Sequence, residues 1–496
     1  METLQLPSVQ LAGIAPEIAL TIAAFVVLVV DAFVGDRGNR LHLPVLATAG
    51  LAAAMYLAIG AWGVNSLQIA RMVAADDFAV FVKVALAAFG VLSVWLARDY
   101  FTRERLEESE PYALILFAVA GMMLMAGAAD LIVVFLALET FSIALYVLVG
   151  LRGTAASEEG SLKYFLLGAF SSAFFLLGIA LVYGAVGSTN LYGQAAGAPG
   201  IVSGLASTPA RDVGLLVLAT GLLIVGLGFK VAAVPFHMWT PDAYQGAPAP
   251  VTGFMAAASK LAGFAVILRL LDATLFSLRW EWRPLVIGIA VLTMVVGSVV
   301  AVVQEDLKRM LAYSSIAHAG FVLTAVVAAN DRGVSGALFY LATYGVTVVG
   351  AFAVVALVAG RGEHGTRLVD QRGLFYERPG LAAALTLFLL SLAGVPLTSG
   401  FVAKLVVFGA AVESGYSWLV VVGAISSAIA AFFYLRVLVV MYMQEREDGA
   451  ETPDRVPIPV LSGVVVGLAA VTTLILGVAW GPLIDVATKA RFVFGG

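Results

Sequence analysis

One carboxylate and three amines lie deep inside strongly apolar stretches of this sequence. Glu139 lies within LIVVFLALETFSIALYVL, nine residues after Asp130 and thirteen before Arg152. Lys230, Lys260 and Lys404 lie in three other apolar runs. An ionisable side chain at the centre of a bilayer costs about 2.5–3.5 kcal/mol, so such residues are rarely kept without a partner or a function.

The chemistry that these residue types favour is proton transfer. Burial favours the neutral form of a lysine amine, and a nearby carboxylate favours the ammonium, so a small change in pairing loads or unloads a proton. Arginine would not serve, because its guanidinium stays charged. The residues therefore predict a buried proton relay of Glu139, Lys230, Lys260 and Lys404, and the alternative for Glu139 is a purely structural ion pair.

Two histidines extend this set. His237 lies in PFHMWTPDAYQGAPAP (235–250), and His318 lies in QEDLKRMLAYSSIAHAG (304–320), with Ser314 and Ser315 one turn earlier. Neutral histidines and hydroxyls pass protons through hydrogen bonds, so both are auxiliary candidates. The alternative for each is a hydrogen bond that only holds helices together.

The remaining basic residues in apolar stretches lie closer to the ends of their segments. Lys163 follows Ser157-Glu158-Glu159 and is either a further auxiliary relay residue or part of a solvated helix end. Lys83 lies about six residues into its segment, where a functional role and an extended side chain reaching the membrane surface are equally open. We expect Arg269 and Arg436 to reach the membrane surface in this way.

The elements that must position these residues are transmembrane helices. Of the 496 residues, 61% are hydrophobic and only 12% are charged, about half the usual charged fraction of soluble proteins. A soluble fold of this size could not keep so much apolar side chain out of water. The N-terminus lacks the basic region of a cleaved signal peptide, so the first helix is expected to be retained.

Several kinds of site are excluded or not signalled. With no Cys there is no disulfide, thiolate metal site or iron–sulfur cluster, and four His without ligand spacing disfavour a bound metal or haem. No phosphate-binding glycine motif signals a nucleotide. The net charge of −4 and the absence of a basic patch argue against nucleic acid.

The hydropathy pattern predicts an all-α polytopic membrane protein of fourteen transmembrane helices. Apolar runs fall at about 14–34, 43–64, 78–97, 112–128, 131–151, 161–186, 213–246, 249–271, 284–304, 307–328, 333–360, 381–411, 416–442 and 458–485. A spanning helix needs about 20 residues.

Two of these runs, the seventh (213–246) and the twelfth (381–411), are too long for one crossing. Each contains a central proline, Pro235 or Pro396, which breaks or kinks a helix. Because five crossings separate the two, helices 4–8 and 9–13 are predicted to be inverted five-helix repeats, as in many transporters. The predicted units are residues 1–111 (helices 1–3), 112–271 (first repeat), 284–442 (second repeat) and 458–496 (helix 14).

The distribution of basic residues predicts the orientation. Loops after odd-numbered helices hold 14 Lys and Arg, whereas loops after even-numbered helices and the two tails hold seven. Excess positive charge marks the cytoplasmic side, so both termini are expected on the outer side.

Three strings make the sequence recognisable: FKVAAVPFHMWTPDAYQGAPAPVTGFMAAASK (229–260), DLKRMLAYSSIAHAGF (306–321) and LAGVPLTSGFVAK (392–404). Together with mid-helix Glu139, they resemble subunit N of bacterial respiratory complex I, the NADH–quinone oxidoreductase, within its family of antiporter-like membrane subunits. The resemblance covers essentially the whole chain. It implies the antiporter-like fold and a proton-translocating subunit of a translocase.

The resemblance also implies roles and partners. Glu139 would pair with Lys230, Lys260 would be the central relay, and Lys404 would lead to the outer exit, with His237 and Lys163 on the same polar axis. NADH, FMN, iron–sulfur clusters and quinone would lie on partner subunits, with no cofactor on this chain. Its partners would be the sister antiporter-like and small membrane subunits, in the bacterial inner membrane. The alternative is a secondary cation/proton antiporter without a redox link.

Overall fold

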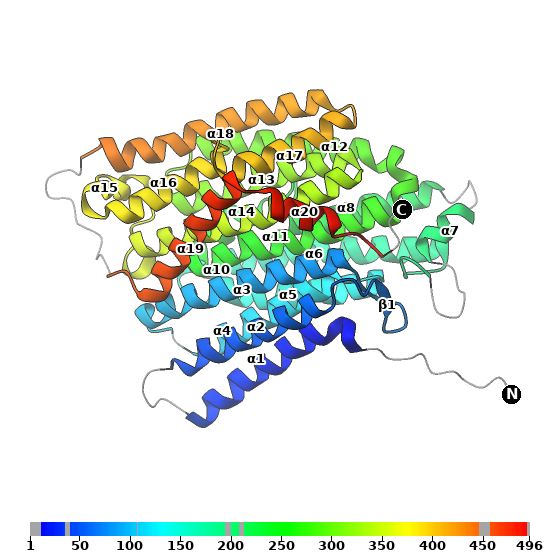
Figure 1. Cartoon of the computed structure of the whole chain (residues 1–496), viewed down its shortest axis with the longest axis horizontal. Coiled ribbons are helices and arrows are strands. Elements are labelled where there is room, and N and C mark those ends of the chain that lie inside the picture. Colours follow the sequence, from blue (N-terminus) through cyan, green and yellow to red (C-terminus); the bar gives the residue numbers. More distant parts are fainter. Residues whose placement is uncertain are drawn as a thin grey trace.

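The computed structural model describes residues 11–34, 40–106, 108–193, 200–207, 213–445 and 457–493. Residues 1–10 lie outside this set. They include the N-terminal residues from which we expected the first helix to be retained. Most described residues are helical, and the helices run side by side along the long axis of the molecule (Figure 1). Among the described residues, twelve helical segments are long and apolar enough to cross a membrane, and two shorter apolar helices, Glu110–Ala126 and Pro379–Ala393, lie among them.

The helices follow the apolar runs of the sequence. The first half contains α1 (Ala15–Val34), α2 (His42–Gly60), α3 (Asp77–Glu104), α4 (Glu110–Ala126), α5 (Leu131–Gly150), α6 (Ala155–Val186), α7 (Ile201–Ser207), α8 (Val213–Lys230), α9 (Trp239–Gly246), α10 (Ala249–Phe254) and α11 (Lys260–Leu268). The second half contains α12 (Arg279–Val302), α13 (Leu307–Ala328), α14 (Asp331–Val358), α15 (Leu374–Glu377), α16 (Pro379–Ala393), α17 (Ser399–Glu413), α18 (Ser417–Met443), α19 (Val460–Val478) and α20 (Gly481–Lys489).

Short irregular elements connect these helices. A hairpin of β1 (Ser66–Gln68) and β2 (Val73–Ala75) joins α2 to α3, with Ser66 opposite Ala75. π-helical segments, Met255–Ser259 and Arg269–Thr274, flank α11, so residues 249–274 form one continuous buried span. Single helical turns lie at Leu11–Ile14, Phe276–Leu278, Arg361–Glu363 and Leu368–Gln371.

Both interruptions expected from the prolines are present. Helix α8 ends at Lys230 and α9 begins at Trp239, on either side of Pro235. Helix α16 ends at Ala393 and α17 begins at Ser399, on either side of Pro396. Backbone groups freed in this way must find partners within the protein, because lipid offers none. The Val234 amide donates to the Thr293 hydroxyl (2.9 Å), and the Gly400 amide donates to the Ser391 hydroxyl (3.1 Å).

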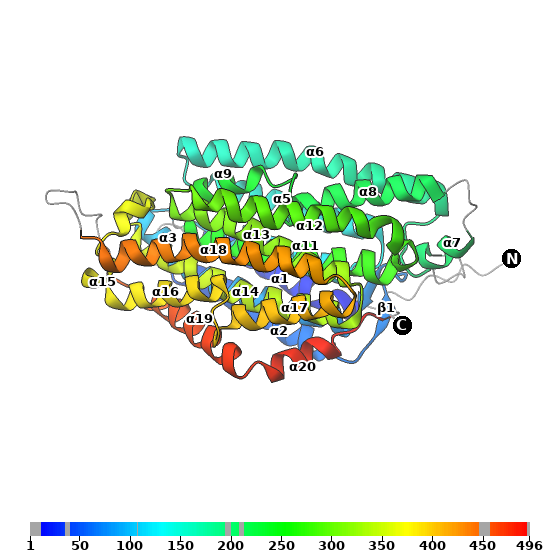
Figure 2. The same ribbon diagram turned by 90° about the horizontal axis from the view of Figure 1, so that it is seen from above.

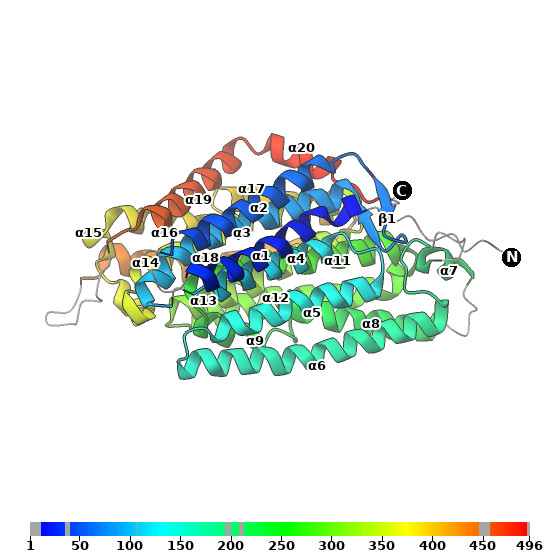
Figure 3. The same ribbon diagram turned by 90° about the horizontal axis from the view of Figure 1, so that it is seen from below.

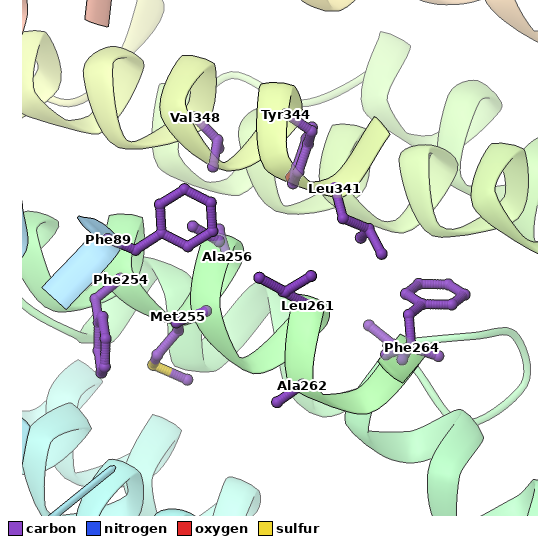
Figure 4. Close-up of a cluster of buried hydrophobic side chains, with 14 of the residues drawn as sticks. Phe89, Phe254, Met255, Ala256, Leu261, Ala262, Phe264, Leu341, Tyr344 and Val348 are labelled. Carbon is purple, nitrogen blue, oxygen red and sulfur yellow. The ribbon is translucent and has the colours of Figure 1, made fainter. Parts of the chain in front are cut away.

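The arrangement places some helices at the edge of the bundle and others at its centre. Helices α6 and α8 lie along one long edge and α19 and α20 along the opposite edge (Figures 2 and 3). Helices α10, α11, α13 and α14 form the centre, where most side chains are buried. Figure 4 shows this packing, with Leu261 of α11 directed toward the helix that carries Tyr344 and Val348.

The two ends of the described chain lie at the same end of the bundle. The Lys83 amine on α3 donates to the Gly13 carbonyl (2.9 Å), and the Phe78 amide, also on α3, donates to the Arg491 carbonyl (3.2 Å). Both the turn before α1 and the segment after α20 therefore pack against the first turns of α3.

Candidate functional site

Lys230 is the last residue of α8, and its side chain points toward α5. Its Nζ donates to the Ser142 hydroxyl (2.6 Å) and contacts the Tyr146 hydroxyl at 3.4 Å. Four aromatic rings surround the amine, with ring centres 5.3–5.5 Å from Nζ: Phe141, Tyr146, Tyr164 and Phe229. Ring faces attract a cation, so this cage offsets part of the cost of burying an ammonium with no carboxylate in contact.

Glu139 lies one turn before Ser142 on α5, but it does not touch Lys230. The carboxylate accepts a hydrogen bond from the Ser172 hydroxyl of α6. Among the described residues Lys230 has no direct ion pair, so the structure brings the expected pair to one hydroxyl-rich region without joining them. Two helical rows create this region, because residues three, four and seven apart share a helix face. Residues 139, 142 and 146 on α5 face residues 164, 168 and 172 on α6.

Lys260 begins α11 at the centre of the bundle and is buried. Its Nζ donates to both the backbone carbonyl and the hydroxyl of Ser315 on α13, the latter at 2.7 Å. The ring of Tyr344 lies 5.6 Å away. The π-helical turn that precedes Lys260 is a distortion frequent at functional sites.

His318 lies between Lys260 and Lys404. Its ring lies 4.8 Å from the ring of Tyr344, which contacts Lys260, and 5.7 Å from the ring of Phe321, which contacts Lys404. The Nδ1 atom hydrogen-bonds to the Tyr340 hydroxyl at 2.6 Å. A small cavity beside His318 is also lined by Tyr340, Ser391 and Gly400 and so reaches the second helix break.

Lys404 reaches back from α17 to the end of α16. Its Nζ donates to the carbonyls of Leu392 (3.1 Å) and Ala393 (2.7 Å) and to the hydroxyl of Ser427 (2.6 Å). The last carbonyls of a helix lack backbone donors and carry the negative end of the helix dipole, so they attract an ammonium. The break at Pro396 exposes these carbonyls to Lys404.

The structure separates Lys163 and His237 from this buried line. Lys163 lies nine residues into α6 with its side chain 43% exposed, paired with Glu159 (2.5 Å) and Asp242 (2.7 Å). Arg309 also binds Asp242 (2.6 Å), which links α6, α9 and α13. His237 is half-buried, and its Nδ1 has no hydrogen-bond partner among the described residues. Neither residue has a hydrogen bond or ion pair to Lys230, Lys260 or Lys404.

Known proteins share this sequence and fold. The family model described as NADH:quinone oxidoreductase/Mrp antiporter, TM, matches residues 128–430. A protein of Parafrankia sp. (strain EAN1pec) named NADH-quinone oxidoreductase subunit N is 42% identical, and the match covers 98% of this chain and 95% of the relative. This chain belongs to the NADH:quinone oxidoreductase/Mrp antiporter family.

Solved structures show how far the fold of this family extends. A chain of respiratory complex I from Thermus thermophilus, solved with bound Aureothin, is 34% identical with a TM-score of 0.79, covering 96% of this chain and 100% of that one. A chain of the Mrp complex from Dietzia sp. DQ12-45-1b has a TM-score of 0.80 at 22% identity, covering 96% of this chain and 97% of that one, and thus shares the fold.

The expectation that Arg269 reaches the membrane surface is wrong for this family member. Its guanidinium is buried and binds both oxygens of Asp76 (2.7 and 2.8 Å), between the rings of Phe78 and Phe492. Asp76 also caps α3 by accepting from the Ala79 amide. An extended guanidinium is unnecessary where a buried carboxylate compensates its charge. The pairing spans 193 residues, so nothing near Arg269 in the sequence signals it.

Three further ion pairs were not anticipated from the sequence. Lys83 is buried against Glu17 at 2.7 Å, so its side chain does not extend to the membrane surface. In the loop after α14, buried Glu363 binds Lys308 (2.6 Å) and Arg152 (3.3 Å) and accepts from the Ala249 amide (2.7 Å). Burial opposes the charged form, but the charges of Lys308 and Arg152 outweigh it and hold the pKa of Glu363 below its ordinary value.

Replacing Arg269 by leucine is expected to destabilise the protein by about 3–5 kcal/mol, because Asp76 would stay buried without its counter-charge. Thermal unfolding of the purified protein in detergent measures this. Arg332→Leu is the matched control, since Arg332 and its partner Glu413 are half-exposed, and such pairs contribute about 1 kcal/mol or less. Equal, small effects of the two substitutions would contradict a stabilising role for the buried pair.

Proposed function

We propose that this chain carries protons across the membrane through Glu139, Lys230, Lys260, His318 and Lys404. As a family member whose relatives are named NADH-quinone oxidoreductase subunit N, it works in the membrane part of NADH–quinone oxidoreductase, the proton-pumping translocase. Electrons pass from NADH to quinone on other subunits, and this chain moves protons in response.

A contrast among the buried basic residues carries the proposal. Lys83, Lys308 and Arg269 each have a carboxylate oxygen at 2.6–2.7 Å. Lys230, Lys260 and Lys404 instead donate only to hydroxyls and backbone carbonyls, in the part of the chain that the structure describes. Burial without a counter-charge favours the neutral form of an amine, so such a lysine can release a proton that a paired lysine holds.

The order of contacts suggests the route. Lys260 and Lys404 are connected through the rings of Tyr344, His318 and Phe321. Hydroxyls of Ser142 and Ser315 lie directly on Lys230 and Lys260. The tyrosine and serine hydroxyls and the His318 imidazole, with water between them, provide donors and acceptors for stepwise transfer, whereas the Phe321 ring only packs against Lys404. His237 and Lys163 are assigned auxiliary roles, at the first break and at the exposed end of α6.

The architecture that fits this route is fourteen crossings with two inverted five-helix repeats, helices 4–8 and 9–13. Each repeat then supplies one interrupted helix, α8/α9 or α16/α17, with a lysine beside its break. Under this proposal the units are 1–111, 112–271, 284–442 and 458–496. Inverted repeats place binding sites at interrupted helices near the middle of the membrane, where Lys230 and Lys404 would lie.

The proposed setting is the bacterial plasma membrane, with both termini on the outer side. The excess of Lys and Arg in the loops after odd-numbered helices supports this orientation. The partners are the sister antiporter-like and small membrane subunits. NADH, FMN, iron–sulfur clusters and quinone are assigned to other subunits. No described residues form a group of three or more His, Asp or Glu that could hold a metal.

A cation/proton antiporter without a redox link would use the same charges. The names of the full-length relatives favour the redox-linked function, because the Mrp chain at 22% identity shows the fold alone. Membranes from a deletion strain separate the two: the proposal predicts loss of NADH-driven proton pumping, and the antiporter predicts loss of sodium tolerance with pumping intact.

Replacing Glu139 by glutamine tests the electrostatic part of the relay. The substitution removes the charge near Lys230 and keeps an acceptor for Ser172, so proton pumping is expected to fall about tenfold while the complex still assembles, equivalent to ~1.4 kcal/mol on the barrier. Pumping is measured in sealed vesicles, with Glu413→Gln as the matched control on the exposed end of α17. Normal pumping by Glu139→Gln would contradict an electrostatic role of Glu139 in the relay.

A further inference from the structure

A groove between α5 and α6 leads from a loop to the lysine cage. It is lined by Tyr146, Gly150, Glu158, Ser161 and Leu162, among others. Gly150 is the last residue of α5 and Glu158 lies in the first turn of α6, so one end of the groove lies at the connecting loop 151–154. Glu158 is exposed. The groove thus begins with a carboxylate beside a polar loop and ends on a tyrosine.

Tyr146 forms the contact between this groove and the cage. Its hydroxyl lies 3.4 Å from Lys230 Nζ, and its ring packs edge-on against Tyr164 with centres 4.6 Å apart. The hydroxyl of Ser161 donates to the Tyr146 carbonyl (2.8 Å) and ties α6 to this turn of α5. Tyr146 is therefore the one side chain of the described structure that both lines this groove and contacts Lys230 Nζ.

Gly168 determines where the Tyr146 hydroxyl lies. A β-carbon at position 168 would overlap the hydroxyl oxygen of Tyr146, so only glycine leaves room for it between α5 and α6. Gly184 on the same helix has nothing within 4 Å of its would-be β-carbon. The small residue at 168 is thus matched to the tyrosine and is not a general feature of α6.

We propose that protons reach Lys230 from the groove between α5 and α6 through the hydroxyl of Tyr146, with Glu158 collecting them at the mouth. This rests on the proposed function, in which Lys230 carries a proton. The Tyr146 O–H bond breaks as its proton moves to neutral Lys230, forming an N–H bond. In the same step the tyrosine oxygen takes a proton from a water in the groove, and that water is reprotonated from the Glu158 carboxyl, which takes its next proton from bulk water, so neither tyrosinate nor hydroxide accumulates.

The first test changes the hydroxyl and its position. Tyr146→Phe keeps the aromatic cage and removes the hydroxyl, and Gly168→Ala displaces it. Both are expected to lower proton pumping by the assembled complex about tenfold, the loss that corresponds to ~1.4 kcal/mol on the transfer barrier. Gly184→Ala, the same change at an open position of α6, is expected to pump normally. Wild-type pumping by both Tyr146→Phe and Gly168→Ala would overturn the proposal.

The second test asks whether water reaches the groove, and it does not depend on Lys230. Because the chain has no native Cys, a single Leu162→Cys can be modified with a charged, membrane-impermeant methanethiosulfonate and detected by the mass of this chain. We expect labelling from the side of the 151–154 loop and loss of pumping on labelling. Leu177→Cys, an exposed position of α6 outside the groove, is the control and is expected to stay unlabelled.

The outcomes distinguish the proposed groove route from the proposed carrier role of Lys230. Failure to label Leu162→Cys, or labelling that leaves pumping intact, would overturn the groove as the uptake route. Normal pumping by Lys230→Arg would instead overturn the carrier role of Lys230, whatever the labelling shows.

Discussion

Replacing Lys404 by methionine is expected to reduce proton pumping to a tenth or less of the wild-type rate. The amine fills the end of the interrupted helix α16, where it donates to two carbonyls and to Ser427. Methionine has similar volume but no exchangeable proton and no hydrogen-bond donor, so the last step of the proposed relay would be lost. The carbonyls of Leu392 and Ala393 would also lose a charged donor, which adds about 1.5–3 kcal/mol of destabilisation.

The measurement is NADH-driven proton uptake by sealed vesicles, with assembly checked on native gels. Lys489→Met is the matched control, because Lys489 lies exposed near the end of α20. An assembled Lys404→Met complex that pumps normally would remove Lys404 from the route. Lys404→Arg separates charge from proton release: it keeps the helix-end contacts and, on this account, still fails to pump.

Much of the fold could be predicted from the sequence because lipid imposes simple rules. Long apolar runs must be helices, since every backbone group needs a partner inside the segment. The two runs too long for one crossing each contain a proline, and both are interrupted at the expected place, around Pro235 and Pro396. The position of Lys404 beside a break was therefore predictable, although its carbonyl partners on α16 were not.

The partners of the buried charges could not be predicted, because they come from distant segments. Arg269 was expected to extend to the membrane surface, yet it pairs with Asp76 from the start of α3. Lys83 pairs with Glu17 of the first helix. Hydropathy gives the depth of a residue but not the helix that faces it, and pairing depends on which helices pack together.

For the proposed relay residues, too, burial could be predicted from the sequence but hydrogen-bond partners could not. The burial of Lys230, Lys260 and Lys404 follows from their apolar neighbours in the sequence. The hydroxyls that bind them, on Ser142, Ser315 and Ser427, lie on other helices, and no spacing rule connects them. The line from Lys260 through Tyr344 and His318 toward Lys404 likewise emerges only when α11, α13, α14 and α17 are packed together.

Two hypotheses for Lys260, that it carries a proton or that it only balances charge, make clearly different predictions. It lies at the centre of the bundle with Ser315 as its hydrogen-bond partner, and no carboxylate pairs with it among the described residues. If Lys260 only supplied positive charge, Lys260→Arg would be mild. If it passes protons, Lys260→Arg would be nearly as damaging as Lys260→Met, because a guanidinium does not release its proton near neutral pH. We expect the second result, with pumping reduced at least tenfold.

The most direct measurement is the number of protons moved per NADH oxidised, in vesicles that contain either the wild-type complex or an assembled Lys260→Arg complex. The relay predicts that Lys260→Arg moves far fewer protons than the wild type and matches Lys260→Met. A wild-type ratio of protons to NADH in the assembled Lys260→Arg complex would contradict it. A side chain that cannot release its proton would then be enough for pumping at this position.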